Sequence, residues 1–363
     1  MSKAEIIDRL CVGVDLHKTQ FTVCAMDEQE EVYLEDVFGT NCEGYATFVN
    51  LMHGFEQEIG FKIELAIETT GNARYFKNRM EAEGFKVVVV NTNKFKVISS
   101  STKKNDANDA KTLAYYLLKE MLPEAHLCDQ TSENIRRMIK TRSILVSSMV
   151  KIKNQIHGMM LGYGIETKSA QLQSIRKRQE LLKSLKDYEF DKFAAVALQT
   201  LLNSLDDLAG LIKNIENELE KMTADNEEKK LLQTVPGIGK IGATTIAAYT
   251  KDMSRFCGSF KHFASYIGIV PSVHNSNNTV HLGKITKRGP VELRTAFVQV
   301  ALGLLRLQSK TKDWRYLIDY DAMKKNKGSG RSIIALTRKI ARVVFAMLIK
   351  HEEFRPELMI RVS

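Results

Sequence analysis

The stretch KNDANDAK, residues 104–111, opens a helix-favouring run that extends to Lys119. Asp106 and Asp109 are three residues apart, so on a helix their side chains lie close together on one face. Two neighbouring carboxylates repel each other unless a cation, a proton or a basic partner lies between them. Acidic residues are also common in a first helical turn, where the helix dipole favours them. The pair alone therefore does not separate a binding site from an ordinary helix start.

The residues upstream of this stretch alternate between strand-like and helix-like segments. Strands are predicted at residues 10–15, 18–26, 31–38, 61–68 and 86–90, and helices at 42–58 and 72–83. The segment KVVVV at 86–90 is apolar at four successive positions, which is typical of a buried strand in a parallel sheet. The element order is β-β-β-α-β-α-β-α, which predicts an α/β domain.

Acidic residues close two of these strands. Asp15 ends the first strand and Glu68 ends the fourth, while Asp106 and Asp109 lie on the helix after the fifth. If the first and fourth strands are neighbours and the helix caps them, all four carboxylates converge. Uncompensated burial of carboxylates is costly, and hard oxygen ligands suit Mg²⁺ or Mn²⁺ acting on phosphodiesters. The alternative is that these acids face solvent independently of one another.

The net charge of +10 is unevenly distributed along the chain. Residues 231–363 hold 22 basic and 8 acidic side chains, a net charge of +14, whereas residues 1–230 hold 31 and 35, a net charge of −4. Such asymmetry indicates a polyanionic partner, most simply nucleic acid.

The cysteines and the apolar segments indicate where the chain works. The five cysteines are scattered and without CxxC spacing, which favours a reducing compartment and argues against a zinc site. We find no apolar run of 18 residues and no signal-peptide pattern, so we expect a cytoplasmic protein with no membrane partner.

The middle of the chain is predicted to be helical. Residues 131–161 form one long segment whose charged face is either solvated or contacts a nucleic-acid backbone. Residues 170–230 carry leucines at spacings of three and four, which predicts an antiparallel helical hairpin or coiled coil. We therefore expect three domains, at residues 1–128, 129–228 and 229–363.

Two motifs stand out in the basic domain. The turn VPGIGK, residues 235–240, precedes a predicted helix and resembles the hairpin of helix-hairpin-helix modules. Gly237, Gly239 and Lys240 would then approach a phosphate, or the glycines would only allow a tight turn. Further on, PSVHNSNN, residues 271–278, reads as a polar loop. Nearby cations could lower the pKa of a serine there and hold a phosphate, although most such loops have no catalytic role. These cations are Lys284, Lys287, Arg288 and Arg294.

The chain resembles a known family in these segments. VGVDLHKTQFTVCAMD, AIETTGN and VVNTNKFKVISSSTKKNDANDAKTLA are similar to the DEDD transposases of the insertion sequence 110 family, which includes the Piv-type invertases. The resemblance implies a RuvC-like ribonuclease H fold with Asp15, Glu68, Asp106 and Asp109 as Mg²⁺ (or Mn²⁺) ligands. The family's P-x-x-x-S-S-G loop places its catalytic serine at Ser276, with Ser272 as the second candidate.

The resemblance also implies a function and partners. Members of the family cut and rejoin donor and target DNA, guided by a noncoding bridge RNA, through a phosphoserine intermediate. A homodimer or homotetramer, in the nucleoid of a bacterium or archaeon, is expected from the need for several active sites. Two rivals remain open: a Holliday-junction-resolvase-like metal nuclease that uses water as nucleophile, and a non-catalytic nucleic-acid-binding scaffold.

Overall fold

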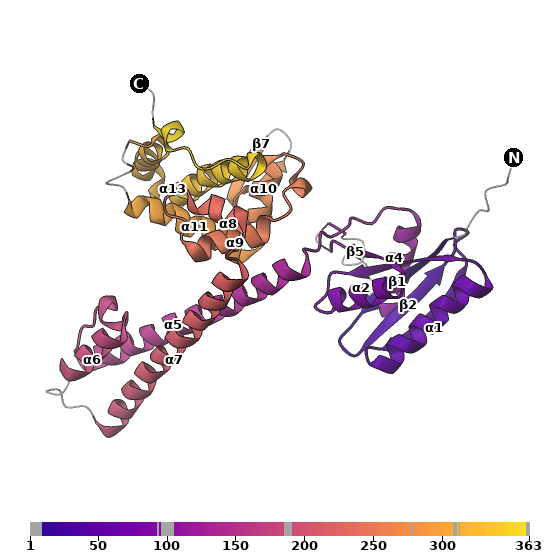
Figure 1. Cartoon of the computed structure of the whole chain (residues 1–363), viewed down its shortest axis with the longest axis horizontal. Coiled ribbons are helices and arrows are strands. Elements are labelled where there is room, and N and C mark those ends of the chain that lie inside the picture. The colour runs from indigo at the N-terminus through magenta and orange to yellow at the C-terminus, as the bar shows by residue number, and fades with distance from the viewer. Residues whose placement is uncertain are drawn as a thin grey trace. The chain divides into compact units, whose positions relative to one another are not determined.

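The computed structural model describes residues 9–92, 94–95, 105–184, 191–276, 279–307, 311 and 313–360. The chain forms two compact units, Met1–Leu127 and Cys128–Ser363 (Figure 1). Within the described ranges, no helix has both the length and the apolar character needed to cross a membrane.

The first unit is built on a five-stranded sheet. Its strands lie in the order β3-β2-β1-β4-β5. The first three strands are joined by short turns and pair antiparallel, whereas β4 and β5 follow helical crossovers and pair parallel to β1 and to β4. The bounds are β1 Arg9–Leu16, β2 Gln20–Met26, β3 Val32–Gly39, β4 Lys62–Glu68 and β5 Lys86–Val90. The predicted α/β character of the N-terminal part is therefore confirmed.

Helices cover both faces of this sheet. On one face lie α1 (Cys42–Glu58) and α2 (Ala73–Ala82), which bury Phe48 and Phe76 against alternate residues of β1 such as Val12. On the other face lies α4 (Asp106–Leu118), whose apolar side packs on the intervening positions of the strands. Because successive side chains of a strand point to opposite faces, the strands contribute to two separate cores, one under α1 and α2 and one under α4.

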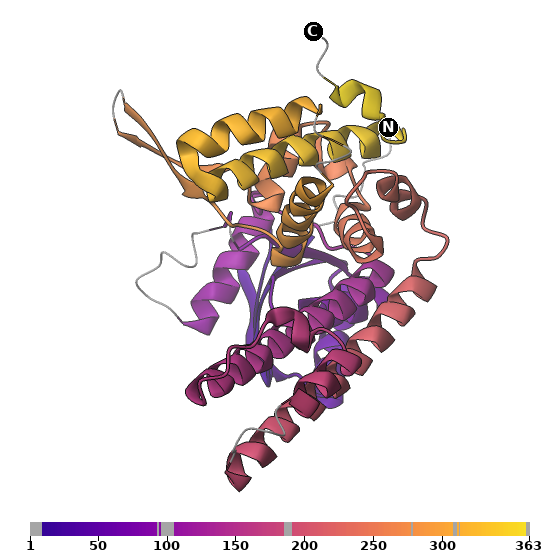
Figure 2. The same cartoon turned by 90° about the vertical axis from the view of Figure 1, so that its left-hand side faces the viewer.

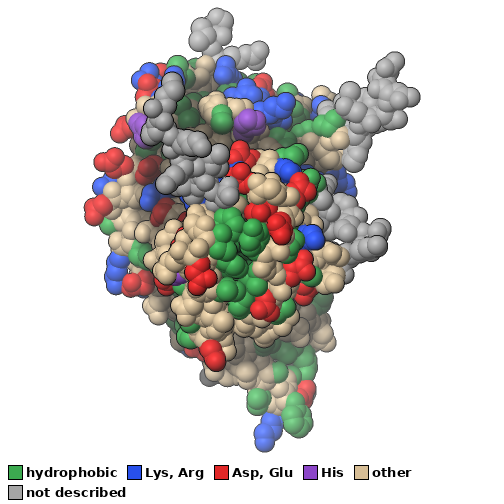
Figure 3. Space-filling model, turned by 90° about the vertical axis from the view of Figure 1, so that its right-hand side faces the viewer, with side chains coloured by type: hydrophobic (Ala, Val, Ile, Leu, Met, Phe, Trp, Pro, Cys, Tyr) green, Lys and Arg blue, Asp and Glu red, His purple; other side chains and the backbone are tan. Residues whose placement is uncertain are grey.

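The surface of the first unit carries many acidic side chains. Figure 3 shows an apolar patch surrounded by acidic groups on the face turned to the viewer. The edge strand β3 also leaves Val32, Tyr33 and Val37 partly exposed. This surface agrees with the acidic balance of the N-terminal sequence.

The second unit begins with two long helices that pack against each other. These are α5 (Gln130–Gly162) and α7 (Lys192–Met222), with η1 (Ser169–Leu172) and α6 (Ile175–Ser184) between them in the chain (Figure 1). Arg142 of α5 pairs with Glu216 of α7 at 2.6 Å, which fixes their antiparallel register. The leucines of residues 170–230 predicted an antiparallel helical hairpin or coiled coil. Helix α7 does pack against an antiparallel helix, but that partner is α5, which lies before residue 170.

The rest of the second unit is mostly helical, as predicted. Its core contains Phe263, Phe297 and Leu336 from three different helices. The elements are α8 Glu227–Gln233, α9 Lys240–Thr250, η2 Ser254–Phe256, α10 Phe260–Ile267, β6 Pro271–Ser276, β7 Thr279–Ile285, α11 Val291–Arg306, α13 Arg315–Lys350 and η3 Pro356–Met359.

Helix α13 is interrupted near its middle. It contains two helical halves joined at Gly328, whose φ of 76° and ψ of 167° are not helical. Figure 2 shows the two halves side by side, and an ion pair between Lys339 and Asp319 links them. Glycine allows this left-handed φ without the steric cost that a side chain would add.

The prediction of a polar loop at residues 271–278 is wrong for residues 271–276; residues 277 and 278 lie outside the described part of the structure. Residues 271–276 form β6, which pairs antiparallel with β7 from Pro271↔Ile285 to Ser276↔Thr279. Figure 2 shows this ribbon extending away from the helices. The composition in Ser and Asn suggested a loop, but the β-branched residues Val273, Thr279 and Val280 favour strands and occur on both sides of the Asn-Asn pair.

Candidate functional site

Two of the four acids lie at the carboxyl ends of neighbouring strands. Strands β1 and β4 are parallel and pair Val14 with Ile67, so Asp15 and Glu68 are the next residues along each strand. The side chain of Asp15 is only 14% exposed. The register of the sheet therefore places these two carboxylates side by side, as the sequence order predicted.

Helix α4 brings the other two acids to the same place. Asn105 caps the helix by accepting a hydrogen bond from the Ala107 amide at 3.3 Å, and Asp106 and Asp109 lie in the first turn. The helix lies almost on the backbone of β1, since a Cβ built on Gly13 would be 1.9 Å from the Ala110 carbonyl oxygen. Only glycine allows this approach, which positions the acids of α4 beside Asp15.

Hydrogen bonds between the loops at the strand ends hold this arrangement. The Thr69 hydroxyl donates to the Val90 carbonyl at 2.6 Å, which joins the ends of β4 and β5. The Asn72 amide donates to the His17 carbonyl at 2.8 Å and accepts from the Thr70 hydroxyl at 3.0 Å. The ends of three strands are therefore tied to one another around the acids.

All four predicted acids line one cavity. It has a volume of 370 Å³ and is also lined by Leu16, His17, Thr70, Thr92, Phe95 and Asn105. The structure thus brings Asp15, Glu68, Asp106 and Asp109 together, and the alternative of independent solvent-facing acids does not describe this geometry.

His17, which was not among the residues predicted from the sequence, also belongs to this cluster. Its Nε2 lies 3.1 Å from Asp15 Oδ2 and 3.4 Å from Asp106 Oδ2. Asp15 and His17 are two residues apart at a strand end, so strand alternation places them on one face. The two-residue spacing from Asp15 is the sequence feature from which His17 could have been predicted as a member of the cluster.

The electrostatics of the cluster favour a cation. Burial raises the pKa of Asp15 above its ordinary value; the His17 imidazole opposes this shift, and the negative charges of Asp106 and Asp109 add to it. One ligand atom each from Asp15, His17 and Asp106 lies within 4.8 Å of the others, so the three could hold a metal ion. The donor set is rich in carboxylate oxygen, which suits Mg²⁺ or Mn²⁺, and the imidazole adds a nitrogen ligand.

The two candidate serines lie on the β6–β7 ribbon of the second unit. Ser276 is the last residue of β6, and its side chain lies outside the described part of the structure. Ser272 lies near the start of the same strand, and a Cβ built on Gly283 of β7 would be 2.3 Å from its Oγ. The Ser272 hydroxyl therefore packs against the opposite strand.

The base of the ribbon is fixed to the end of α10. A Cβ on Gly268 would be 2.1 Å from the Arg288 carbonyl oxygen, and one on Gly289 would be 1.9 Å from that of Tyr266. Arg294 donates to the carbonyls of Ile267 at 3.2 Å and Lys287 at 3.1 Å. The guanidinium of Arg294 thus positions the ribbon. The sequence had predicted a phosphate contact for Arg294, not this structural role.

The other residues predicted to contact nucleic acid include three exposed cations and a glycine that packs against a helix. Lys284, Lys287 and Arg288 are exposed at the base of the ribbon. Gly237, with a φ of 88°, packs against the backbone of α11, where its Cβ would be 3.1 Å from the Leu304 nitrogen. This packing explains Gly237 without a phosphate.

The second part of the same turn is more open. Gly239 caps α9 with no neighbour within 4 Å of a built Cβ. Lys240 pairs with Glu220 at 3.3 Å and remains exposed. A phosphate contact at these two residues stays a prediction.

Comparison with known proteins shows which class of protein combines such an acidic cavity with a basic helical unit. Residues 12–165 match a model of DEDD type described as a transposase, and residues 229–316 match one described as "Transposase IS116/IS110/IS902 family". The two matches cover about two thirds of the chain. The protein is a transposase, an enzyme that cleaves and rejoins DNA. It belongs to the insertion sequence 110 family.

Two relatives align with nearly the whole chain, and a third aligns with about two thirds of it. The chain is 26% identical over 345 residues, 95% of its length and 91% of the relative's, to the transposase for insertion sequence element IS1111A of Coxiella burnetii. It is 26% identical over 355 residues, 94% of its length and 97% of the relative's, to the pilin gene-inverting protein of Moraxella bovis. A third relative, the transposase for IS1328 of Yersinia enterocolitica, is 27% identical and aligns with 65% of this chain and 69% of its own.

Proposed function

We propose that this transposase cuts DNA with the cavity formed by Asp15, Glu68, Asp106 and Asp109 as its divalent-metal site. The observation that carries the proposal is that one 370 Å³ cavity is lined by all four acids. The sheet order β3-β2-β1-β4-β5, with a mixed parallel and antiparallel pattern, supports a RuvC-like ribonuclease H fold for the first domain.

The residues present fit Mg²⁺ or Mn²⁺. Carboxylate oxygens from Asp15, Glu68, Asp106 and Asp109 would hold the ion, and His17 would either add a ligand or orient Asp15 and Asp106. Such an ion supplies Lewis-acid stabilisation to phosphate oxygens. The strand-end hydrogen bonds hold the carboxylates in place, so little reorganisation is needed when a phosphodiester arrives.

We propose Ser276 as the nucleophile. Its hydroxyl oxygen would bond to the scissile phosphorus while the bond from phosphorus to one strand's oxygen breaks. The proton lost by the serine would be taken up by that departing oxygen, which leaves as a free hydroxyl. The resulting phosphoserine ester conserves the energy of the phosphodiester for rejoining. Packing of Ser272 against Gly283 makes Ser272 the weaker candidate. Lys284, Lys287 and Arg288 would neutralise charge on the phosphate.

A bridge RNA and several subunits complete the proposal. Three of the six basic side chains on α5 are already engaged: Arg136 donates to the Ala248 carbonyl, Arg137 pairs with Glu133 and Arg142 pairs with Glu216. The exposed Lys140 and Lys151 are thus the better candidates for RNA or DNA backbone contact on this helix. Gly239 and Lys240 would contact a phosphate at the start of α9. Strand exchange between donor and target DNA requires a dimer or tetramer.

Denaturing gels test this proposal. Purified protein, the flanking noncoding RNA, Mg²⁺ and end-labelled junction DNA are combined, and wild type is compared with Ser276→Ala, Ser272→Ala and Asp109→Ala. We expect a protein-linked DNA band in wild type and in Ser272→Ala. It should be absent from Ser276→Ala and Asp109→Ala.

The same experiment separates the rival mechanisms. Cleavage that persists in Ser276→Ala without a linked band would mean that water attacks, as in a resolvase-like nuclease. Equal product with and without RNA would remove the guide RNA from the proposal. No cleavage by any form, together with DNA binding, would support the scaffold.

A further inference from the structure

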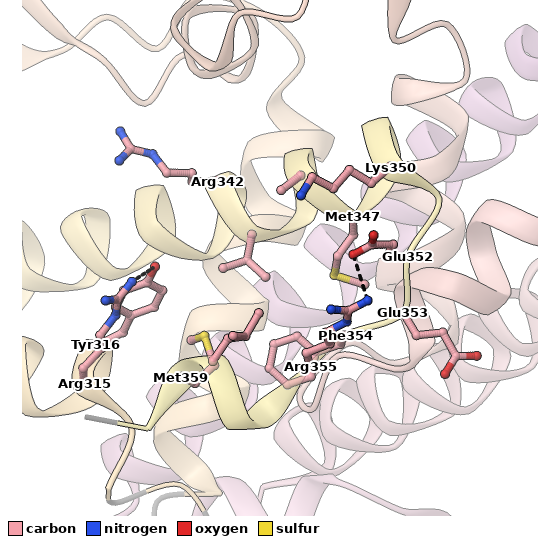
Figure 4. A pocket seen from close by; sticks show the side chains of 13 residues that line it. Arg315, Tyr316, Arg342, Met347, Lys350, Glu352, Glu353, Phe354, Arg355 and Met359 are labelled. Carbon is pink, nitrogen blue, oxygen red and sulfur yellow. Dashed lines mark hydrogen bonds and ion pairs between the residues drawn. The ribbon is translucent and has the colours of Figure 1, made fainter. Parts of the chain in front are cut away.

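A second cavity lies in the C-terminal part of the second unit. It has a volume of 280 Å³ and forms where the start of α13, the last turns of α13 and residues 352–359 come together (Figure 4). Four cationic side chains line it, against two acidic ones, Glu352 and Glu353. The cations are Arg315, Arg342, Lys350 and Arg355.

The interior of this cavity is apolar and aromatic. Ala346, Met347 and Met359 contribute aliphatic surface, and the rings of Tyr316 and Phe354 line its sides. Figure 4 shows the cationic side chains spread around these apolar groups. A ligand that fits must therefore have a flat or apolar part as well as negative charge.

The wall formed by the chain end is fixed in place. The Phe354 amide donates to the Thr234 hydroxyl at 3.0 Å, and its ring lies 5.4 Å from that of Trp314. Met359 is buried. The cavity is thus preformed, which lowers the conformational entropy that a ligand must overcome.

The four cations of this cavity differ in the partners that they already have. Arg355 pairs with Glu352 at 3.3 Å, whereas Arg342 lies 4.8 Å over the Phe260 ring. Among the residues that the structure describes, neither Arg342 nor Lys350 has an ion pair with a carboxylate. Arg315 donates to the Tyr316 hydroxyl at 3.2 Å, which places its planar guanidinium beside that ring.

We propose that this cavity binds one unpaired nucleotide of a DNA or RNA strand. The base would lie against the aliphatic floor and the Tyr316 and Phe354 rings, and Arg315, Arg342 and Lys350 would contact its phosphates. Aromatic side chains combined with a basic groove are how proteins bind single strands without sequence preference. The inference rests on the nucleic-acid substrate of the family and is independent of the cleavage chemistry.

The test measures strand binding by the full-length chain without divalent ion or guide RNA, so its outcome is separate from that of the cleavage assay. Labelled single strands of DNA and of RNA are titrated by fluorescence anisotropy, in intact form and with abasic nucleotides. We expect the wild type to bind the intact strand about tenfold more tightly than the abasic one. The strand type with the larger difference identifies the natural source.

Two variants test the cavity, each with a matched control on α13: one fills its floor and the other removes a positive charge from its lining. Ala346→Leu occupies the floor at an exposed helical position, and Ala322→Leu makes the same change at an exposed position that does not line the cavity. Ala346→Leu should abolish the difference between intact and abasic strands, while Ala322→Leu keeps it. Lys350→Gln should weaken binding of both strands more than Lys324→Gln does. An unchanged intact-to-abasic ratio in Ala346→Leu, with native thermal melting, would overturn the proposal.

Discussion

The acid cavity and the serine ribbon differ in how their backbone is supported. Around the acids, two paired strands, a capped helix and three loop hydrogen bonds meet. Ser276 ends a strand of a two-stranded ribbon, whose described attachments lie at its base, at Gly268, Gly289 and Arg294. The first unit thus holds its four carboxylates on a well-supported backbone, whereas the second unit carries its candidate nucleophile on an extended ribbon.

The largest expected effect is on cleavage by the acid cavity. Asp15→Asn and Asp109→Asn keep the shape of the side chain but remove its charge, so strand cleavage should fall by at least about a hundredfold. The rate of appearance of labelled product measures this. Asp36→Asn, an exposed change on β3 outside the cavity, is the matched control and should cleave as wild type does. Equal losses in all three would show that general charge, and not the cavity, matters.

Gly13→Ala tests whether close packing of α4 fixes the acids. The added Cβ would collide with the Ala110 carbonyl and the Ala114 nitrogen, so α4 must move. We expect a loss of about 1–3 kcal/mol in the free energy that protects α4 from hydrogen exchange, accompanied by loss of cleavage. Gly54→Ala, in α1 with nothing within 4 Å, should be neutral or stabilising. Normal protection of α4 in Gly13→Ala would contradict this packing account.

Variants of Arg294 and Lys284 separate two roles at the ribbon: holding the ribbon in position and contacting DNA. Arg294→Met removes two hydrogen bonds to carbonyls and should lower the free energy of unfolding of the second unit by about 1–3 kcal/mol. Lys284→Met should change stability by less than about 0.5 kcal/mol but weaken DNA binding. The chain has one tryptophan, Trp314, whose fluorescence during urea unfolding reports on this unit. The opposite pattern would reverse the roles that we assign.

The smallest effect concerns pH and the start of α5. Burial disfavours the charged form of Asp129, but hydrogen bonds from Ser132 and the Lys251 ammonium outweigh it and lower the pKa of Asp129 to about 2. Its stabilisation is therefore present above about pH 4, where the unfolded carboxyl is ionised, and is lost as the pH falls toward 2.

Because Asp129 is 44% exposed, we expect at most about 1 kcal/mol from it. Asp129→Asn, which retains a capping oxygen, should flatten the stability of the second unit between pH 4 and 2, again followed through Trp314. A wild-type slope in that variant would assign the pH dependence to other groups.

Much of the first unit could be predicted from sequence, because its signals are local and periodic. The helix over residues 42–58 and the strand over 86–90 have the predicted bounds. The convergence of the acids followed from the element order, since neighbouring parallel strands end at the same edge. His17 could have been found from its spacing to Asp15, but a lone histidine near a strand end has many structural explanations.

The second unit was harder to predict because its decisive contacts are distant in sequence. Ser and Asn at 271–278 suggested a loop, yet pairing with residues 279–285 makes a strand. The pairing of α7 with α5 depends on where the chain reverses, which the leucine spacing does not encode. Gly237 contacts α11 more than 60 residues later, so only the structure distinguishes packing from phosphate binding there.

Whether the converging acids form a metal site is tested most directly by Mn²⁺ binding to the full-length protein, measured by calorimetry and by the loss of free-ion paramagnetic resonance. Wild type is compared with the double variant Asp15→Asn/Asp106→Asn and with Asp36→Asn. We expect saturable Mn²⁺ binding in wild type and Asp36→Asn, competed by Mg²⁺ and lost in the double variant. Equal Mn²⁺ affinity in all three proteins would contradict this expectation, because the converging acids would then not be the metal site.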